Sequence, residues 1–193
     1  MPVTAHFQAF LSGPRLDLRE VRPDDVTGGY YQWMNDPEVT HYLESRFFPN
    51  SVEGLRTYVA ERHADRTNVF LALVVRDGAR HIGNIKLGPI DWIHRRADIG
   101  ILIGEKDCWG AGFATEAIRL VIEYAFLRLN LHKVTAGCYD PNVGSIRAFE
   151  KAGFVREGVR REHFYCDGRY LDLILLGLIR PTDAKFESGG TSR

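Results

Sequence analysis

The chain has 193 residues, 45% of them hydrophobic, which suits one domain with a substantial buried core. Lysine plus arginine and aspartate plus glutamate number 25 each, and this balance excludes proteins that hold nucleic acid or an anionic membrane by net charge. Met1 to Ser12 lacks the pattern of a secretory signal, and no apolar run reaches the length of a membrane span, so we expect a soluble, cytoplasmic protein.

The N-terminal third predicts one strand and two helices. Arg15 to Val21 alternates polar and apolar residues as a half-buried strand does. Pro23-Asp-Asp25 offers a break and an N-cap, and a helix should follow to about Met34. Ser51 opens a second helical stretch, in which three apolar residues recur at helical spacing: Leu55, Tyr58 and Val59.

The middle of the chain predicts an antiparallel meander. Val69 to Arg76 is a dense apolar run, and Asp77-Gly78 is a hairpin signal. Arg80 to Leu87 resumes strand composition, and Arg95 to Ile103 forms a third strand after another turn. These three strands are expected to pair in sequence order.

From Ala114 the hydrophobic period becomes helical, with apolar residues along one face: Ile118, Val121, Ile122, Ala125 and Leu129. Lys133 to Tyr139 is another strand, and Asp140-Pro-Asn142 starts a short helix that ends at Gly153. Two long strands, about 155–165 and 169–179, join at Asp167-Gly168, and 187–193 has the composition of a disordered tail.

The cysteines and histidines indicate no metal site and no disulfide framework. Cys108, Cys138 and Cys166 are an odd number without a CxxC spacing, and the seven histidines are scattered without an HExxH pattern. Cys138 lies within an apolar strand, where a small core residue is more typical than a nucleophile.

Gly110-Ala-Gly112 lies between the third meander strand and the following helix. Glycines let the backbone approach a ligand closely, and unpaired N–H groups at a helix start point at phosphate oxygens, so this turn suits an anion cradle. The alternative is a helix entry that needs only unusual backbone angles. The glycine spacing alone leaves both open.

A dinucleotide-binding fold is the main rival, because Gly110-x-Gly112-x-x-Thr115 nearly matches GxGxxG. However, the sixth position is Thr115, and Asp140, the nearest candidate for the ribose-binding acid, comes 25 positions after it. Charged residues 105–107 also separate the preceding strand from the first glycine. No Gly-Lys-Ser/Thr follows, which excludes a P-loop.

Three motifs in chain order carry a family resemblance: Trp33-Met-Asn35-Asp-Pro37-Glu-Val39, Trp109-Gly-Ala-Gly112-Phe-Ala114, and a helix from Asn142-Val-Gly-Ser145 to Gly153-Phe154. With these motifs, the stretch from Leu16 to Leu178 resembles the GNAT superfamily of N-acetyltransferases. Within it, the ribosomal-protein N-terminal acetyltransferase branch is the most similar. The second motif departs from the usual family form by having Trp109 as its first residue.

The resemblance implies that acetyl-coenzyme A is the cosubstrate. The strand end Leu102-Ile103-Gly104 would pair its backbone with the pantetheine amides, as an added strand does. The pyrophosphate would lie against the glycine turn, formed by Trp109, Gly110, Ala111, Gly112, Phe113, Ala114 and Thr115. Asn142 would contact the pantetheine arm, and Ser145 would lie near the sulfur.

Acetyl transfer to an amine requires a base, because the amine must lose a proton to attack the thioester. Asp98 is the first candidate, since many family members have a glutamate there; pairing with Arg95 or Arg96 is the structural alternative. Glu162 and His163 are alternative bases. Family members often place a tyrosine acid where this chain has Phe149.

Two other residues are candidates for the acid that protonates the thiolate. Ser145 is one, with helix capping as its structural alternative, and Tyr139 is the other. Without either, catalysis would rest mainly on positioning and on donors to the oxyanion.

The acceptor is expected to be a primary amine, either a protein N-terminus or a small amino compound such as an amino sugar. Trp33 and Asn35 are candidate acceptor contacts, with a core position as the alternative for Trp33. Acidic residues near this end could bind the amine: Asp36, Glu38 and Glu44. A homodimer stays an open alternative.

We therefore predict a single mixed α/β (α+β) domain over residues 1–186, of GNAT type. Its mostly antiparallel twisted sheet would contain one parallel, splayed pair, flanked by about four helices. Two other functions stay open: an acyl-coenzyme A-binding module without turnover, and a nicotinamide-dependent oxidoreductase that binds NAD instead.

Overall fold

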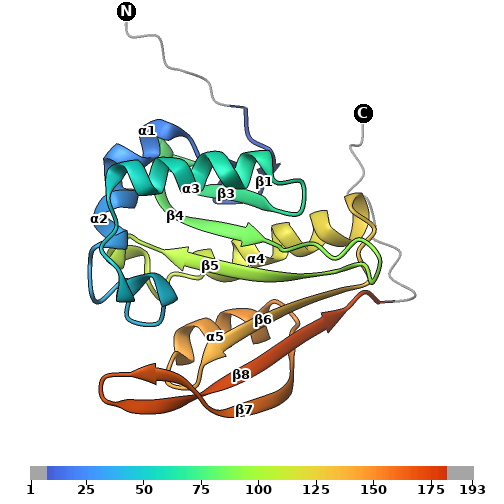
Figure 1. Cartoon of the computed structure of the whole chain (residues 1–193). Coiled ribbons are helices and arrows are strands. Elements are labelled where there is room, and N and C mark those ends of the chain that lie inside the picture. The colour runs from blue at the N-terminus through green and yellow to red at the C-terminus, as the bar shows by residue number, and fades with distance from the viewer. Residues whose placement is uncertain (1–7, 182–193) are drawn as a thin grey trace, which may run out of the picture.

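The computed structural model of the chain describes residues 8–181, and its framework is one eight-stranded sheet in the order β1-β2-β3-β4-β5-β6-β8-β7. Every neighbouring pair is antiparallel except β5 and β6, which run parallel. Helices cover both faces of the sheet, as Figure 1 shows for α3 on one face and α4 on the other. This is the mixed α/β arrangement that the sequence predicts.

The N-terminal part contains the strands β1 (Leu11–Ser12) and β2 (Leu16–Glu20), of which only β2 was expected. A bent helical segment follows, made of α1 (Pro23–Asp25), η1 (Val26–Tyr30) and α2 (Tyr31–Met34). The 3-10 helix η2 (Glu44–Phe47) precedes α3 (Val52–Ala64). The Ser51 hydroxyl accepts a hydrogen bond from Gly54 N–H, which confirms the predicted N-cap of α3.

The predicted meander is β3 (Val69–Val75), β4 (Arg80–Leu87) and β5 (Arg96–Ile103). The turn between β3 and β4 is the short helix η3 (Asp77–Ala79), in which Gly78 has a φ of 77°. An L-residue is strained at this angle, which explains the glycine at the turn.

The C-terminal half begins with η4 (Lys106–Cys108), α4 (Phe113–Glu123) and η5 (Tyr124–Arg128). It continues with β6 (Lys133–Tyr139), α5 (Val143–Lys151), β7 (Val155–Cys166) and β8 (Arg169–Ile179). Each predicted element is present, with boundaries that differ by a few residues at most. The tail predicted over 187–193 lies outside the described residues.

The parallel strands β5 and β6 are paired over a short stretch and then separate. β5 and β6 pair only where Arg96–Asp98 faces Lys133–Thr135, and beyond these residues β6 pairs with β8 alone. Figure 1 shows the two strands diverging from this junction. A wedge between two strands of one sheet therefore opens toward the C-terminal end of β5.

Two hydrophobic cores lie on opposite faces of the sheet. On one face, α4 and α5 pack on strand residues that include Ile85, Ala97 and Ile99. On the other face, η1, α2 and α3 pack on Phe70, Ala72 and Val74. Because side chains alternate between the two faces along a strand, a residue whose two neighbours are in one core has its side chain on the opposite face. No helix among residues 8–181 is both long and apolar enough to cross a membrane.

Candidate active site

The glycine turn, Gly110-Ala-Gly112, leads into the uncapped N-terminus of α4, which we call the α4 entry. Gly110 and Gly112 have φ values of 73° and 86°, which L-residues rarely adopt. Gly112 is the N-cap of α4, and no side chain caps the helix, so the first N–H groups of α4 are left for a ligand. A Cβ on Gly110 would meet nothing within 4 Å, so the space in front of this backbone is free for an anion.

An ion pair between distant parts of the chain supports this helix entry. Arg15, at the start of β2, donates from Nε to Glu116 at 2.8 Å and from Nη1 to the Ala111 carbonyl at 2.9 Å. Burial raises the pKa of Glu116, but hydrogen bonds from Arg15 and from Leu16 N–H outweigh it and hold that pKa below its ordinary value. No sequence pattern indicated a role for Arg15. The one local signal was Glu116, an acidic residue in the first turn of α4, where a negative charge is favourable.

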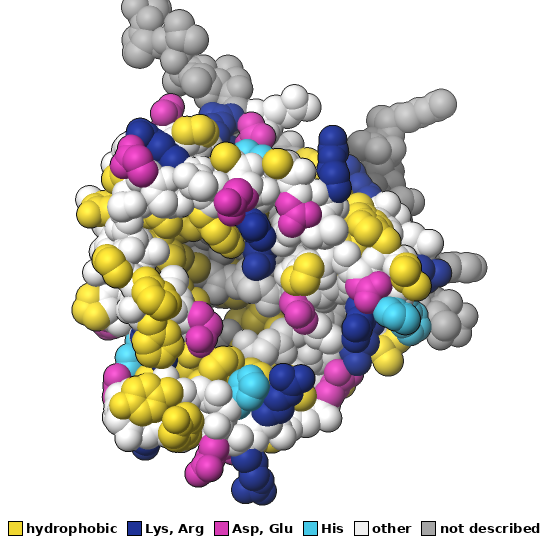
Figure 2. Space-filling view, in the orientation of Figure 1, with side chains coloured by type: hydrophobic (Ala, Val, Ile, Leu, Met, Phe, Trp, Pro, Cys, Tyr) yellow, Lys and Arg dark blue, Asp and Glu magenta, His cyan; other side chains and the backbone are white. Residues whose placement is uncertain are grey.

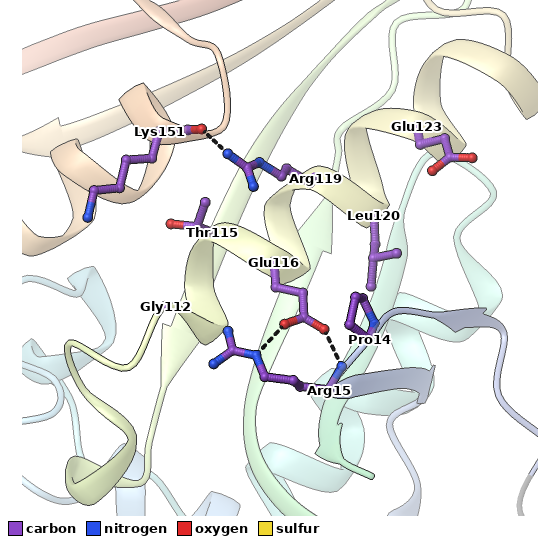
Figure 3. A pocket seen from close by; sticks show the side chains of 9 residues that line it. All are labelled: Pro14, Arg15, Gly112, Thr115, Glu116, Arg119, Leu120, Glu123 and Lys151. Carbon is purple, nitrogen blue, oxygen red and sulfur yellow. Dashed lines mark hydrogen bonds and ion pairs between the residues drawn. The ribbon is translucent and has the colours of Figure 1, made fainter. Parts of the chain in front are cut away.

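A pocket of about 520 Å³ lies against this helix, between the β1–β2 turn and α5. Figure 3 shows Gly112 and Thr115 at its edge, with Arg119 donating to the main-chain oxygen of Lys151 at 2.6 Å. Three cations line the pocket, Arg15, Arg119 and Lys151, together with the carboxylates of Glu116, which pairs with Arg15, and Glu123. The open N–H groups of α4 suit the phosphates of coenzyme A.

Backbone groups of β5 face the wedge. Gly104 N–H donates to the Ile82 carbonyl, and Gly88 N–H donates to the Asp98 carbonyl. Because the direction of backbone groups alternates along a strand, every second residue of β5 from Asp98 to Gly104 presents its N–H and C=O groups to β4. Leu102 and Gly104 are among these, which corrects the expectation that their backbone binds pantetheine. The N–H and C=O groups of Ile101 and Ile103 point the other way, into the wedge, and the Trp109 indole donates to the Ile103 carbonyl at 2.8 Å.

The start of α5 lies across the wedge from β5. The Asn142 side-chain oxygen caps α5 by accepting from Ser145 N–H at 3.2 Å, which leaves its NH2 group without a partner among the described residues. The Ser145 hydroxyl lies 3.3 Å from the Cys138 sulfur. Burial raises the pKa of Cys138, as it does for Cys108, and an unactivated thiol is a poor nucleophile. Phe149 is buried in the core.

Asp98 is on the face of the sheet that carries α3, because its neighbours Ala97 and Ile99 are both in the core on the opposite face. Its carboxylate is exposed and accepts a hydrogen bond from the hydroxyl of Thr135, directly across the parallel junction. Asp98 and Thr135 line a pocket of about 310 Å³, with Arg96 on its rim. The structural alternative, in which Asp98 pairs with Arg95 or Arg96, is not found among the described residues, where Arg96 pairs with Asp91 at 3.5 Å.

The two alternative bases lie on β7. Glu162 donates its N–H to Asp172 and is exposed, and the His163 ring packs edge-on against Phe164. Neither lies at the parallel junction, which is where the wedge begins.

Tyr139 joins a loop to the sheet. Its hydroxyl donates to Glu44 and accepts from Arg46, and its ring stacks on Phe164 with centroids 4.1 Å apart. Burial and the Glu44 carboxylate raise the pKa of Tyr139 to about 12. The phenol proton is therefore already donated in a hydrogen bond to Glu44. The contacts of Tyr139 with Glu44 and Arg46 also fix the loop containing η2 beside the wedge.

The predicted acceptor contacts are structural. Trp33 is only 5% exposed, and its indole donates to Glu105 at 2.9 Å, so the core alternative is the one that the geometry supports. The Asn35 side chain donates to two main-chain oxygens and accepts from Asn50 N–H, which ties two loops together. Neither side chain is left to bind an acceptor.

The acidic residues expected to bind an amine are also engaged. Lys106, just after β5, forms ion pairs with Asp36 at 2.8 Å and with Glu38 at 2.6 Å, while Glu44 accepts a hydrogen bond from Tyr139.

A cluster of polar side chains lies at the turn between β7 and β8. The atoms of His41, Cys166 and Asp167 that could bind a metal lie within 4.8 Å of one another. The sequence had placed no metal here, and we assign none.

We expect Gly104→Ala to destabilise the fold, because a Cβ there would lie 1.9 Å from a ring atom of Trp33. Overpacking of this kind costs about 1–3 kcal/mol or more. The matched control is Gly100→Ala on the same strand, where the Cβ would meet nothing within 4 Å. Urea unfolding of both variants measures the difference, and equal midpoints would contradict the packing of Trp33 on Gly104.

Comparison with known proteins assigns the family. The acetyltransferase (GNAT) domain family matches residues 15–155. The chain belongs to the GNAT acetyltransferase family. Its reaction is therefore the transfer of an acetyl group from acetyl-coenzyme A to an amine.

GNAT relatives cover most of the chain. An uncharacterized N-acetyltransferase, p20, of Bacillus licheniformis is 30% identical over 172 residues, which are 86% of this chain and 93% of the relative. The spermidine N(1)-acetyltransferase of Escherichia coli K12 is 34% identical over 163 residues, covering 84% and 85%. A putative ribosomal N-acetyltransferase of Bacillus subtilis, YdaF, is 36% identical over 98 residues, only 51% of this chain.

A solved structure shares the fold. The spermidine N-acetyltransferase of Vibrio cholerae, in complex with coenzyme A and spermine, superposes with a TM-score of 0.78 at 27% identity. The match covers 86% of this chain and 96% of that one. The fold class and the cosubstrate predicted from the sequence are confirmed, whereas the ribosomal branch is matched only over about half of the chain.

Proposed function

We propose that this GNAT enzyme acetylates the primary amine of a small molecule, with Asp98 as the base. The observation that carries the proposal is the position of Asp98, an exposed carboxylate at the apex of the wedge on the face opposite α4. The acceptor can therefore approach the thioester from the α3 face while the donor lies between β5 and β6. Figure 2 shows this face hollowed between α3 and the β7–β8 hairpin.

The donor side is formed by main-chain groups. The first N–H groups of α4 bind the diphosphate, and Gly110 and Gly112 let it come close. Ile101 and Ile103 pair with the pantetheine amides, and the Asn142 NH2 group donates to the same arm. These contacts position the thioester near the parallel junction, where β5 and β6 separate.

The chemical step is direct attack. Asp98 accepts a proton from the amine, directly or through one water, while the nitrogen bonds to the thioester carbon. The carbon–sulfur bond then breaks, and the thiolate leaves with coenzyme A. Ser145 is the candidate for donating a hydrogen bond to that sulfur, whereas Tyr139 is given a positioning role, since Glu44 already holds its proton.

A small acceptor is favoured over a protein N-terminus because the Escherichia coli spermidine acetyltransferase matches 84% of the chain in sequence and the Vibrio cholerae one covers 86% in structure, whereas the ribosomal relative matches 51%. The test is release of coenzyme A thiol from acetyl-coenzyme A in the presence of small amines or of peptides with free N-termini. Turnover of peptides alone would overturn the choice of acceptor. Binding of coenzyme A without turnover of any amine would favour a binding module.

A further inference from the structure

Two cationic side chains on the α3 side of the sheet, Arg62 and Lys86, have donor groups without a hydrogen-bond partner among the described residues. The Arg62 Nε is buried and makes no hydrogen bond within the described residues, although its guanidinium lies over the Tyr58 ring at 5.2 Å. Lys86 is half-buried, and its ammonium has no hydrogen-bond partner in the same part of the chain. Buried donors are nearly always satisfied, so the unpaired Nε of Arg62 requires an explanation.

Both groups face the side of the sheet that the acceptor uses. Lys86 lies between Ile85 and Leu87, which belong to the core on the opposite face, so its side chain points to the α3 face as that of Asp98 does. Lys86 is paired across β4–β5 with Gly100, where a Cβ would meet nothing within 4 Å. The space above this glycine is open.

The electrostatics agree with this arrangement. Burial lowers the pKa of Lys86, the nearby Arg62 lowers it further, and Asp98 opposes the shift. An anion between the two cations would relieve their repulsion and pair with both charges.

Two carboxylates near Arg62 do not satisfy Nε. Glu61 is exposed and approaches only the terminal Nη2, at 3.7 Å. Asp65 accepts hydrogen bonds from Thr67 and Asn68 instead. The acidic residues that would suit a polyamine are likewise engaged, Asp36 and Glu38 by Lys106.

We propose that the acceptor carries an oxyanion, a carboxylate or a phosphate, next to its primary amine. The oxyanion binds Lys86 and Arg62 on the α3 face, while the amine lies at Asp98. This inference rests on the proposed function and specifies its substrate class. It separates this enzyme from its polyamine-acetylating relatives, since a polyamine would bring a second positive charge to these cations.

The test compares amines that differ only in the anion. One pair is 6-aminohexanoate and hexylamine, the other is glucosamine 6-phosphate and glucosamine, with spermidine as the polycation. Thiol release gives kcat/KM for each, and calorimetry on the protein loaded with coenzyme A gives binding. We expect the anionic member of at least one pair to be preferred roughly tenfold or more, and the pair that responds identifies the anion.

Variants then assign the preference to these residues. Lys86→Met and Arg62→Met should each remove most of it, mainly through KM, and Lys86→Glu should raise turnover of spermidine. Arg56→Met is the matched control, because Arg56 is exposed on the same helix and pairs with Glu53. Preservation of the preference in both methionine variants, or equal use and equal binding within both pairs, would overturn the proposal.

The two proposals fail separately. Turnover of neutral and anionic amines at equal rates would remove the oxyanion site and leave the acetyltransferase. Anion-selective binding without turnover of any amine would retain the oxyanion site and overturn the proposed catalysis.

Discussion

Replacement of Asp98 by asparagine is expected to lower kcat/KM by about 10²–10⁴-fold, the usual contribution of a positioned general base. The carboxylate lies on the acceptor face at the wedge apex and is held by the Thr135 hydroxyl. Asparagine retains its size but cannot accept a proton from an amine. Thiol-release kinetics measure the loss, and the affinity for coenzyme A should stay unchanged.

Two further variants test whether the effect belongs to this carboxylate. Thr135→Val removes the hydroxyl that orients Asp98, so it should lower kcat/KM by a smaller factor. Asp77→Asn, in the exposed β3–β4 turn, should change nothing. Wild-type kinetics in Asp98→Asn would exclude Asp98 as the base and direct attention to Glu162 and His163.

Gly110→Ala is expected to weaken coenzyme A binding by roughly 10–100-fold, because a Cβ would occupy the space in front of the α4 entry and displace at least one charge-assisted hydrogen bond. The free protein would lose only about 1–2 kcal/mol, the cost of holding an L-residue at positive φ. Calorimetric titration with coenzyme A measures the affinity.

Gly78→Ala is the matched control for this strain. Gly78 has a φ of 77°, close to the 73° of Gly110, and a Cβ there also meets nothing within 4 Å. Both variants should therefore lose similar stability, but only Gly110→Ala should lose affinity. An equal loss of affinity in the two would show that the glycine turn does not hold the diphosphate.

The elements of this fold could be predicted because their signals are local. The helical period after Ala114, the Ser51 cap and the Asp167-Gly168 turn each depend on residues within a few positions of one another. The same holds for the glycine turn, whose spacing reflects the αL angle at Gly112 and an uncapped helix start.

The details of the site were less accessible. The resemblance implied that Leu102, Ile103 and Gly104 bind pantetheine through their backbone, but Leu102 and Gly104 turn their backbone groups to β4. Which alternate residues face a neighbour depends on strand register, and register is set by the packing of whole strands. Trp33 was ambiguous for a similar reason, since its burial depends on Gly104, far along the chain.

The sequence by itself indicated the family, the order of elements and the cosubstrate, because the glycine turn and the helix that follows it are formed by contiguous residues. Only the tertiary structure decided the acceptor side. It joined Arg15 to Glu116, engaged Asp36 and Glu38 with Lys106, and left the Arg62 Nε and the Lys86 ammonium without a hydrogen-bond partner among the described residues. These contacts join residues far apart in the chain, and no local pattern encodes which charges remain free once the chain has folded.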